Sequence, residues 1–348
     1  MCLVERESLG ALAPAWDELV AVAPLPSPFL RSWWLENTAS PGSTFLLVLS
    51  GEQLLGGLAV DRDVRLGVER VRPMGEDLGP DHLDLVAAPG SEAVVEAALS
   101  EWFARPGGRI IELEGIVEGA RLEAVVAPMR GRRWVGSSTA PWVELKGDFE
   151  QYRSSLPSRL RNSVARTSSR LKRLGVRYHV AEPEESEEAI EWLHRLHTAS
   201  RGPHSTFLPC FPRFAVAASI GIARGELMIH QLVAGDEVIA TQAWFEVGDR
   251  ASFYQCGRNS TDPQWRGAGN VLHAFVAERA FELGFKELDF LRGNERYKLE
   301  WADRSRTQVT YLVAKGASAR TVAKAREART HLAGSISSHH PSWAPLTR

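Results

Sequence analysis

One loop organises this chain: Gln264-Trp265-Arg266-Gly267-Ala268-Gly269-Asn270. The residues before it, 253–257, have the pattern of a strand, and the run 270–283 after it has the pattern of a helix. Glycines in such a loop remove Cβ atoms and let backbone N–H groups come close to a ligand. The N-terminus of the helix adds about half a positive charge. The sequence therefore predicts an anion-binding turn, and a pyrophosphate is its most natural ligand.

A second polar motif follows the next expected strand, 286–291. It reads Asp289-Phe-Leu-Arg292-Gly-Asn-Glu295-Arg-Tyr297-Lys298-Leu-Glu-Trp301. Together the two motifs give the order strand, glycine loop, helix, strand and polar turn, which is the setting that an anion-binding loop requires. A less specific interpretation stays open at this point, because Glu295 and Lys298 lie three residues apart and could form a surface ion pair of little energetic weight.

With these two motifs the sequence resembles the GNAT superfamily of acyl-CoA N-acyltransferases, whose coenzyme A pyrophosphate loop has the form Q-x-x-G-x-G in this setting. The second motif is similar to the end of the CelD-like branch, a relative of the FemAB aminoacyl-ligating enzymes. The resemblance covers about residues 145–315 well and the N-terminal half loosely. It implies acyl-CoA, with acetyl-CoA as the first choice, as the donor substrate and an amine as the acceptor.

The resemblance also assigns residues to the donor and to the chemistry. The donor-binding residues it implies are Gln255, Cys256, Gly257, Gln264, Trp265, Arg266, Gly267, Ala268, Gly269 and Asn270. The catalytic candidates are Asp289, Glu295, Tyr297 and Lys298.

Acyl transfer from a thioester needs a base for the amine, a donor for the oxyanion and an acid for the departing thiolate. We expect Asp289 or Glu295 to be the base and Tyr297 the acid, with Lys298 pairing a carboxylate or a phosphate. We expect a main-chain N–H within 255–257 to polarise the acyl carbonyl.

A basic segment is the third candidate feature. Residues 153–177 hold eight Lys or Arg residues, and no acidic residue occurs between Gln151 and Ala181. Arginine there could bind phosphates of coenzyme A, of a nucleotide-bearing substrate or of a tRNA acceptor arm. The alternative is a solvated helix face, which is the usual role of such a stripe. We assign Arg159 and Arg166 of this segment, together with Arg292 and Trp301 of the second motif, to substrate binding.

Composition excludes several classes. The 348 residues carry a net charge of −2, which gives no general reason to expect DNA or an anionic membrane as a partner. The three cysteines, Cys2, Cys210 and Cys256, have no paired spacing and fit reduced thiols in the cytoplasm. The charged N-terminus does not resemble a signal peptide, and no apolar run is long enough to span a membrane. His194 and His197 lack a third ligand, so we expect no metal.

The order of expected elements occurs twice, once in 44–145 and again in 226–313, with 64–71 expected as one strand of the first copy. The predicted fold class is therefore α/β with a mixed sheet, built as two tandem GNAT-like domains, each a mostly antiparallel twisted sheet flanked by helices. We expect the N-terminal domain at 1–146, the acyl-CoA-binding catalytic domain at 147–316, and a basic helix with a tail at 317–348.

Only the second copy has the glycine loop. Its counterpart in the first copy, 74–82, is acidic and interrupted by proline, so its carboxylates would repel a pyrophosphate. We therefore expect one donor site per chain, and an N-terminal domain that shapes the acceptor cleft.

The sequence favours an N-acyltransferase that moves an acyl group from acyl-CoA to an amine of a small-molecule, cell-envelope or natural-product acceptor. Two alternatives stay open. One is a FemAB-like transfer from aminoacyl-tRNA, and the other is an idle GNAT copy kept as a binding module. The sequence identifies neither the acceptor nor the oligomeric state.

Overall fold

The computed structural model describes residues 1–129 and 131–334, and these residues divide into two compact units. Unit 1 contains residues 1–139 together with 306–334, and unit 2 contains residues 140–305. The last strand and helix thus pack with the first unit, whereas a linear division of the sequence would place that strand in the second domain.

Unit 1 is built on a mixed sheet. Its strands are β1 (Cys2–Arg6), β2 (Ser43–Ser50), β3 (Gln53–Arg65), β4 (Val68–Pro73), β5 (Val86–Ala87), β6 (Arg109–Val117), most of β7 (Arg132–Glu144) and most of β13 (Arg304–Lys315). The first four pair antiparallel in chain order, β4 and β6 pair parallel, and β13 adds antiparallel to β6.

Five α-helices accompany this sheet within the described residues of unit 1. They are α1 (Ala13–Ala21), α2 (Ser32–Thr38), α3 (Glu92–Ala104), α4 (Arg121–Val126) and α11 (Ala317–Gly334). Helix α3 buries Val95, Leu99 and Phe103 at intervals of four residues, which places them on one stripe facing the sheet. That stripe joins the inward residues of β2, β3 and β6 in one apolar core.

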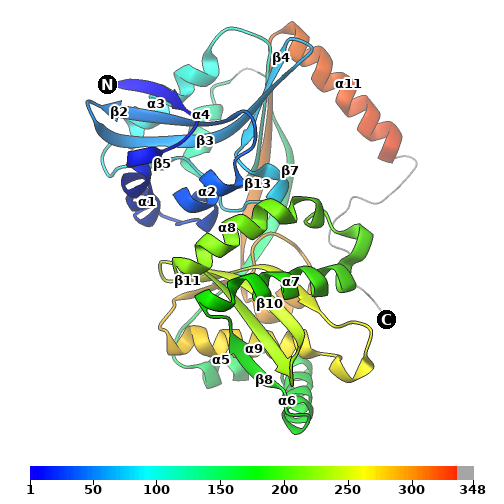
Figure 1. Cartoon of the computed structure of the whole chain (residues 1–348). Helices are drawn as coiled ribbons and strands as arrows, with labels where there is room; N and C mark the ends of the chain where they lie inside the picture. The colour runs from blue at the N-terminus through cyan, green and yellow to red at the C-terminus, as the bar shows by residue number, and fades with distance from the viewer. Residues whose placement is uncertain (130, 335–348) are drawn as a thin grey trace. The chain divides into compact units, whose positions relative to one another are not determined.

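Unit 2 repeats the plan with its own strands and helices. The strands are β8 (Arg177–Val180), β9 (Leu227–Ala234), β10 (Glu237–Val247), β11 (Arg250–Arg258) and β12 (Glu287–Asp289). The helices are α5 (Phe149–Ser155), α6 (Ser158–Arg173), α7 (Ser186–Arg201), α8 (Phe211–Ala223), α9 (Ala268–Glu282) and α10 (Arg296–Trp301). Figure 1 shows α7 and α8 on one face of β9–β11 and α9 on the other.

The pairing of strands is the same in the two units, which confirms the predicted fold class. In unit 2 the first four strands again pair antiparallel, β11 and β12 pair parallel, and β12 pairs antiparallel with β7. Parallel neighbours need a crossover connection, and helix α3 supplies it in unit 1 and helix α9 in unit 2. In each unit the last strand of the sheet comes from a distant part of the chain. This strand is β13 beside β6 in unit 1 and β7 beside β12 in unit 2.

Two expected strands differ from the structure. The stretch 64–71 is not one strand, because β3 continues to Arg65 and a turn at Leu66 and Gly67 separates it from β4. Leu66 has a φ of +53° and an exposed side chain. An apolar residue thus lies in the turn, where the sequence pattern predicts a continuous strand. The expected strand 286–291 is shorter, since Leu291 has a φ of +54° and leaves the extended conformation. Strand β1 was not predicted.

Candidate active site

Strands β11 and β12 separate soon after they pair. Their parallel register runs from Arg250 opposite Glu287 to Ser252 opposite Asp289 and then stops. Strand β11 continues to Arg258, still paired with β10 on its other edge. Beyond Ser252, β11 therefore has an edge without a parallel partner within the described chain, and the residues that follow β12 face this edge.

The chain after β12 is bent away by the carboxylate of Asp289. This side chain is fully buried, and its Oδ1 accepts the Leu291 N–H at 2.7 Å. The bond holds the turn that brings α10 back toward β11, so the contacts of Asp289 are those of a residue that shapes the site.

Tyr297 extends from α10 to the free edge of β11. Its ring meets Phe253 edge-on at 6.4 Å and stacks on His273 of α9 at 5.8 Å. The hydroxyl is buried, and among the described residues it has no hydrogen-bond partner. Burial, reinforced by the neighbouring Cys256 and Glu295, raises the pKa of Tyr297 well above its ordinary value. The phenol is therefore protonated at neutral pH and has a proton to give.

Glu295 and Lys298 form a buried pair beside Tyr297. Their side chains are 3% and 4% exposed, and Oε2 lies 3.4 Å from Nζ. Lys298 also donates to the Arg292 carbonyl at 2.6 Å, whereas within the described chain neither carboxylate oxygen of Glu295 has a hydrogen-bond partner. Each unsatisfied buried polar group costs about 1–3 kcal/mol, and such groups concentrate where a ligand completes them. The surface ion pair considered from the sequence is thus not what the structure shows.

Gly293 makes this arrangement possible. It has a φ of +136°, and a Cβ at this position would overlap the Glu295 carboxylate and crowd the Lys298 ammonium. Only glycine combines that backbone conformation with the space that the buried pair needs.

His197 is a member of the site that the sequence did not assign. Its Nδ1 lies 2.8 Å from the Cys256 carbonyl and its Nε2 lies 2.8 Å from the Ser205 hydroxyl. Since a carbonyl only accepts, Nδ1 carries the proton and Ser205 donates to Nε2. Burial lowers the pKa of His197 to about 4, so the ring is neutral at pH 7. The close approach of α7 to β11 depends on Gly257, where a Cβ would overlap the α7 backbone.

Cys256 lies between these groups. Burial raises the pKa of its thiol, so the thiol is protonated at neutral pH and is a poor nucleophile. Gln255, its neighbour in β11, is buried, and its Oε1 has no partner among the described residues.

The glycine loop caps helix α9 as its sequence predicts. Gly267 is the N-cap residue with a φ of +87°, and the first turn of α9 contains no acidic residue. A Cβ on Gly267 would touch the Thr167 side chain of α6, whereas a Cβ on Gly269 would meet open space. The Gln264 side chain bonds to Asp262, which itself caps the short helix before the loop. Trp265 packs into the core, and the Asn270 N–H bonds to the Gly267 carbonyl as the helix begins.

Helix α6 brings part of the basic segment to this loop. Arg170 donates to the Arg266 carbonyl at 2.5 Å, and Arg166, Arg170 and Arg173 line one hollow on the surface of α6. Arg159 is exposed on the same helix but does not line that hollow. The loop, the N-terminus of α9 and the cations of α6 form a site with the charge that an anion requires.

The remaining assigned residues have structural contacts. Trp301 is buried, its carbonyl accepts the Tyr152 hydroxyl at 2.8 Å, and its ring faces His273 at 5.8 Å. Ala268 is buried in the first turn of α9, and Arg292 is half-buried with its carbonyl bound to Lys298.

Neither a metal centre nor a membrane span emerges from the residues that the structure describes. In that part of the chain no three His, Cys, Asp or Glu side chains gather to hold an ion, and His194 packs on Phe211 at 4.4 Å instead. None of its helices has the length and apolar character needed to cross a bilayer.

Comparison with known proteins agrees with this geometry. Residues 158–299 match the family model described as an acetyltransferase (GNAT) domain. No curated protein sequence matches the chain.

Solved structures share the fold at low identity. FemX has a TM-score of 0.62 at 9% identity, covering 87% of this chain and 96% of its own. A conserved protein of unknown function from Bacteroides thetaiotaomicron has a TM-score of 0.60 at 9% identity, covering 89% of this chain and 99% of its own. L-PGS from Bacillus licheniformis has a TM-score of 0.51 at 12% identity, covering 79% of this chain and 85% of its own. Residues 158–299 therefore match a GNAT domain, and this range contains the glycine loop and the Tyr297 cluster.

Proposed function

We propose that this chain, whose second unit carries a GNAT domain, is an N-acyltransferase that moves an acyl group from acyl-CoA to an amine. One observation supports the proposal most. The point where β11 and β12 separate is surrounded by buried polar groups without partners among the described residues, and these groups match the requirements of acyl transfer.

The residues of the loop fit a coenzyme A pyrophosphate. Gly267 and Gly269 expose the backbone at the N-terminus of α9, and Arg166 and Arg170 supply positive charge beside it. Acyl-CoA, when bound, would supply a thioester, from which the coenzyme A thiolate is a good leaving group. We place the phosphates at this loop and the acyl end along the free edge of β11.

Three groups of the chain then act on the reacting atoms. Glu295 takes a proton from the attacking amine, and its Oε2 lies 3.4 Å from the Lys298 ammonium, which holds the carboxylate in place. The Cys256 N–H donates to the oxyanion, because a strand residue directs its N–H and C=O to the same edge, and His197 contacts that edge. Tyr297 gives its proton to the departing thiolate, since its hydroxyl is protonated at neutral pH and has no hydrogen-bond partner among the described residues.

A transfer from aminoacyl-tRNA is the second candidate. The basic stripe of α6 favours it. Arginines of this stripe would pair with the phosphates of a nucleic acid just as they would with the phosphates of coenzyme A. The glycine loop at the N-terminus of α9 favours coenzyme A, because the positive end of one helix is suited to one pyrophosphate. A catalytically idle binding module would need only the loop, and the buried Glu295 and Tyr297 would then have no function.

A thermal-shift panel separates the three. Acetyl-CoA and longer acyl-CoAs should raise the melting temperature in proportion to the logarithm of their concentration, with aminoacyl-tRNA and free nucleotides as comparisons. Release of free thiol from acyl-CoA, measured with a panel of amines, then tests for turnover. Stabilisation by aminoacyl-tRNA alone would favour the second candidate, and binding of acyl-CoA without turnover of any amine would favour the binding module.

A further inference from the structure

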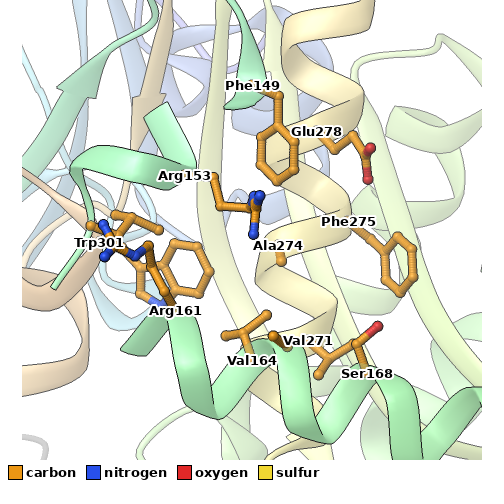
Figure 2. Close-up of a pocket in the computed structure, with 12 residues that line it drawn as sticks. Phe149, Arg153, Arg161, Val164, Ser168, Val271, Ala274, Phe275, Glu278 and Trp301 are labelled. Carbon is orange, nitrogen blue, oxygen red and sulfur yellow. The ribbon is translucent and has the colours of Figure 1, made fainter. Parts of the chain in front are cut away.

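An apolar groove lies between helices α5, α6 and α9, along the flank of α9 from Val271 to Glu278. It has a volume of about 180 Å³. Its walls are chiefly the side chains of Phe149, Leu156, Val164, Val271, Phe275 and Trp301. Figure 2 shows Phe149 and Phe275 on one side of this space and Trp301 on the other. The proposed donor loop, 264–270, contributes none of these side chains.

The lining decides what kind of group can occupy the groove. Its volume equals that of about six water molecules, yet the walls offer water few hydrogen-bond partners, and apolar cavities of this kind stay dry or take hydrocarbon. Transfer of a hydrocarbon chain from water gains about 0.8 kcal/mol for each buried methylene. The groove is thus suited to a single alkyl chain.

Two guanidinium groups with N–H donors lie at the mouth of the groove. Arg153 and Arg161 border it, and Figure 2 shows the Arg153 guanidinium reaching between Phe149 and Ala274. Glu150 engages Nε and Nη2 of Arg153, which leaves Nη1 without a partner among the described residues. Arg161 uses one Nη to donate to the Ser154 carbonyl.

One acidic side chain, Glu278, also borders the groove. Figure 2 shows its carboxylate pointing away from Arg153 and from the Trp301 end. No acidic residue occurs in the chain between Gln151 and Ala181, so α6 contributes only cations to this mouth. An anionic head group is therefore favoured over a cationic one.

From this arrangement we infer that the groove binds the alkyl chain of a single-chain amphiphile whose head group is a carboxylate or a phosphate monoester. The chain lies between α6 and α9, and the head group pairs with Arg153 and Arg161. The inference goes beyond the proposed transfer reaction and does not rest on it, because it concerns a different face of α9.

Calorimetric titration with laurate and with dodecyl phosphate, each below its micelle concentration, tests the inference on the full chain. Both should bind, and dodecyl maltoside and dodecylammonium should bind at least tenfold more weakly. Equal binding of the neutral or cationic amphiphile, or no binding of either anion, would overturn the inference. Displacement of dodecyl phosphate by coenzyme A would also overturn it, since the groove would then belong to the donor site.

Variants locate the site. Ala274→Phe from α9 and Ser168→Phe from α6 fill the groove from opposite walls, so each should lower affinity at least tenfold, and one suffices if the other folds poorly. Arg153→Gln with Arg161→Gln should reduce the affinity for the anions to that for dodecyl maltoside. Lys172→Gln is the matched control, because Lys172 is exposed on α6 but does not border the groove. Full binding by both filled variants, or an equal loss in the control, would contradict the assignment.

Discussion

The two units share an order of strands but differ at the N-terminus of the crossover helix. In unit 1, helix α3 has Glu92 in its first turn, so a carboxylate already complements the helix dipole. In unit 2, the first turn of α9 has no acidic residue, and Arg170 of α6 lies beside it. The pairing of strands is thus the same in both units, whereas the charges around the N-terminus of the crossover helix differ.

The loops before these helices also differ in whether carboxylates occupy their backbone N–H groups. In unit 1 the Asp61 carboxylate accepts the Gly75 N–H at 3.0 Å and the Ser43 hydroxyl, which ties the loop to the sheet. Burial, opposed by Arg72, raises the pKa of Glu76 in that loop. The carboxylates of Asp61 and Glu76 are therefore engaged in contacts that hold this loop in place. In unit 2 the glycine loop leaves backbone open at Gly269.

The largest expected effect concerns Tyr297, which has no assigned counterpart in unit 1. Tyr297→Phe keeps the ring between Phe253 and His273 but removes the proton that the leaving group needs. Turnover should fall about a hundredfold or more, the usual size of a general acid contribution, with donor affinity nearly unchanged. Thiol release and calorimetry measure the two quantities. Wild-type turnover in both Tyr297→Phe and Glu295→Gln would place the catalysis elsewhere.

A second effect follows from His197, one of the buried histidines of unit 2. The pKa of His197 is about 4 in the fold, against about 6.5 in an unfolded chain. The unfolded chain therefore binds more protons between these values, so the contribution to stability is full above about pH 6.5 and is lost as the pH falls toward 4. The free energy of unfolding should decrease by about 3 kcal/mol over this range on account of His197.

Urea unfolding at pH 7.0, 5.5 and 4.5 measures this dependence. His197→Gln should be less stable at pH 7 but should show a shallower decline in acid. His179→Gln is the control, because His179 is exposed beside Glu185. Parallel declines in wild type and His197→Gln would show that His197 does not carry the acid sensitivity.

The smallest effect concerns the cations of α6 that line its surface hollow. Arg166→Gln and Arg170→Gln should each weaken coenzyme A binding about two- to fivefold, since an exposed ion pair contributes roughly 0.2–1 kcal/mol. The loss should shrink at high salt. Calorimetry in 0.05 M and 0.5 M NaCl checks this, with Lys172→Gln as a cation of the same helix outside the hollow. A loss that ignores salt, or that Lys172→Gln shares, would remove these arginines from the donor site.

The sequence predicted much of unit 2 because its signals are local. The helix expected over 270–283 is α9, whose bounds differ from that range by one or two residues. The glycine loop was recognisable for the same reason, since its conformation depends on residues within a few positions. The addition of β13 to unit 1 was not predictable in this way, because its partner β6 lies almost two hundred residues away.

The candidate site shows the same limit. Glu295 and Lys298 were catalytic candidates, but a surface ion pair stayed open because their spacing says nothing of burial, which arises from α10 folding back on β11. His197 gave the pattern of a metal ligand, and its contact with Cys256 depends on Gly257 letting two distant segments meet. The assigned roles of these residues in catalysis stay predictions.

The central claim is that one acyl-CoA binds per chain, at the N-terminus of α9. Calorimetric titration of coenzyme A into wild type, Gly269→Asp and Gly269→Asn tests it most directly. Gly269 is the better position than Gly267, because it has no positive φ and open space around its Cβ. The account predicts one site in wild type, at least a tenfold loss of affinity in Gly269→Asp from the added charge, and a clearly smaller loss in the isosteric Gly269→Asn. Two sites per chain, or equal affinity in wild type and Gly269→Asp, would contradict it.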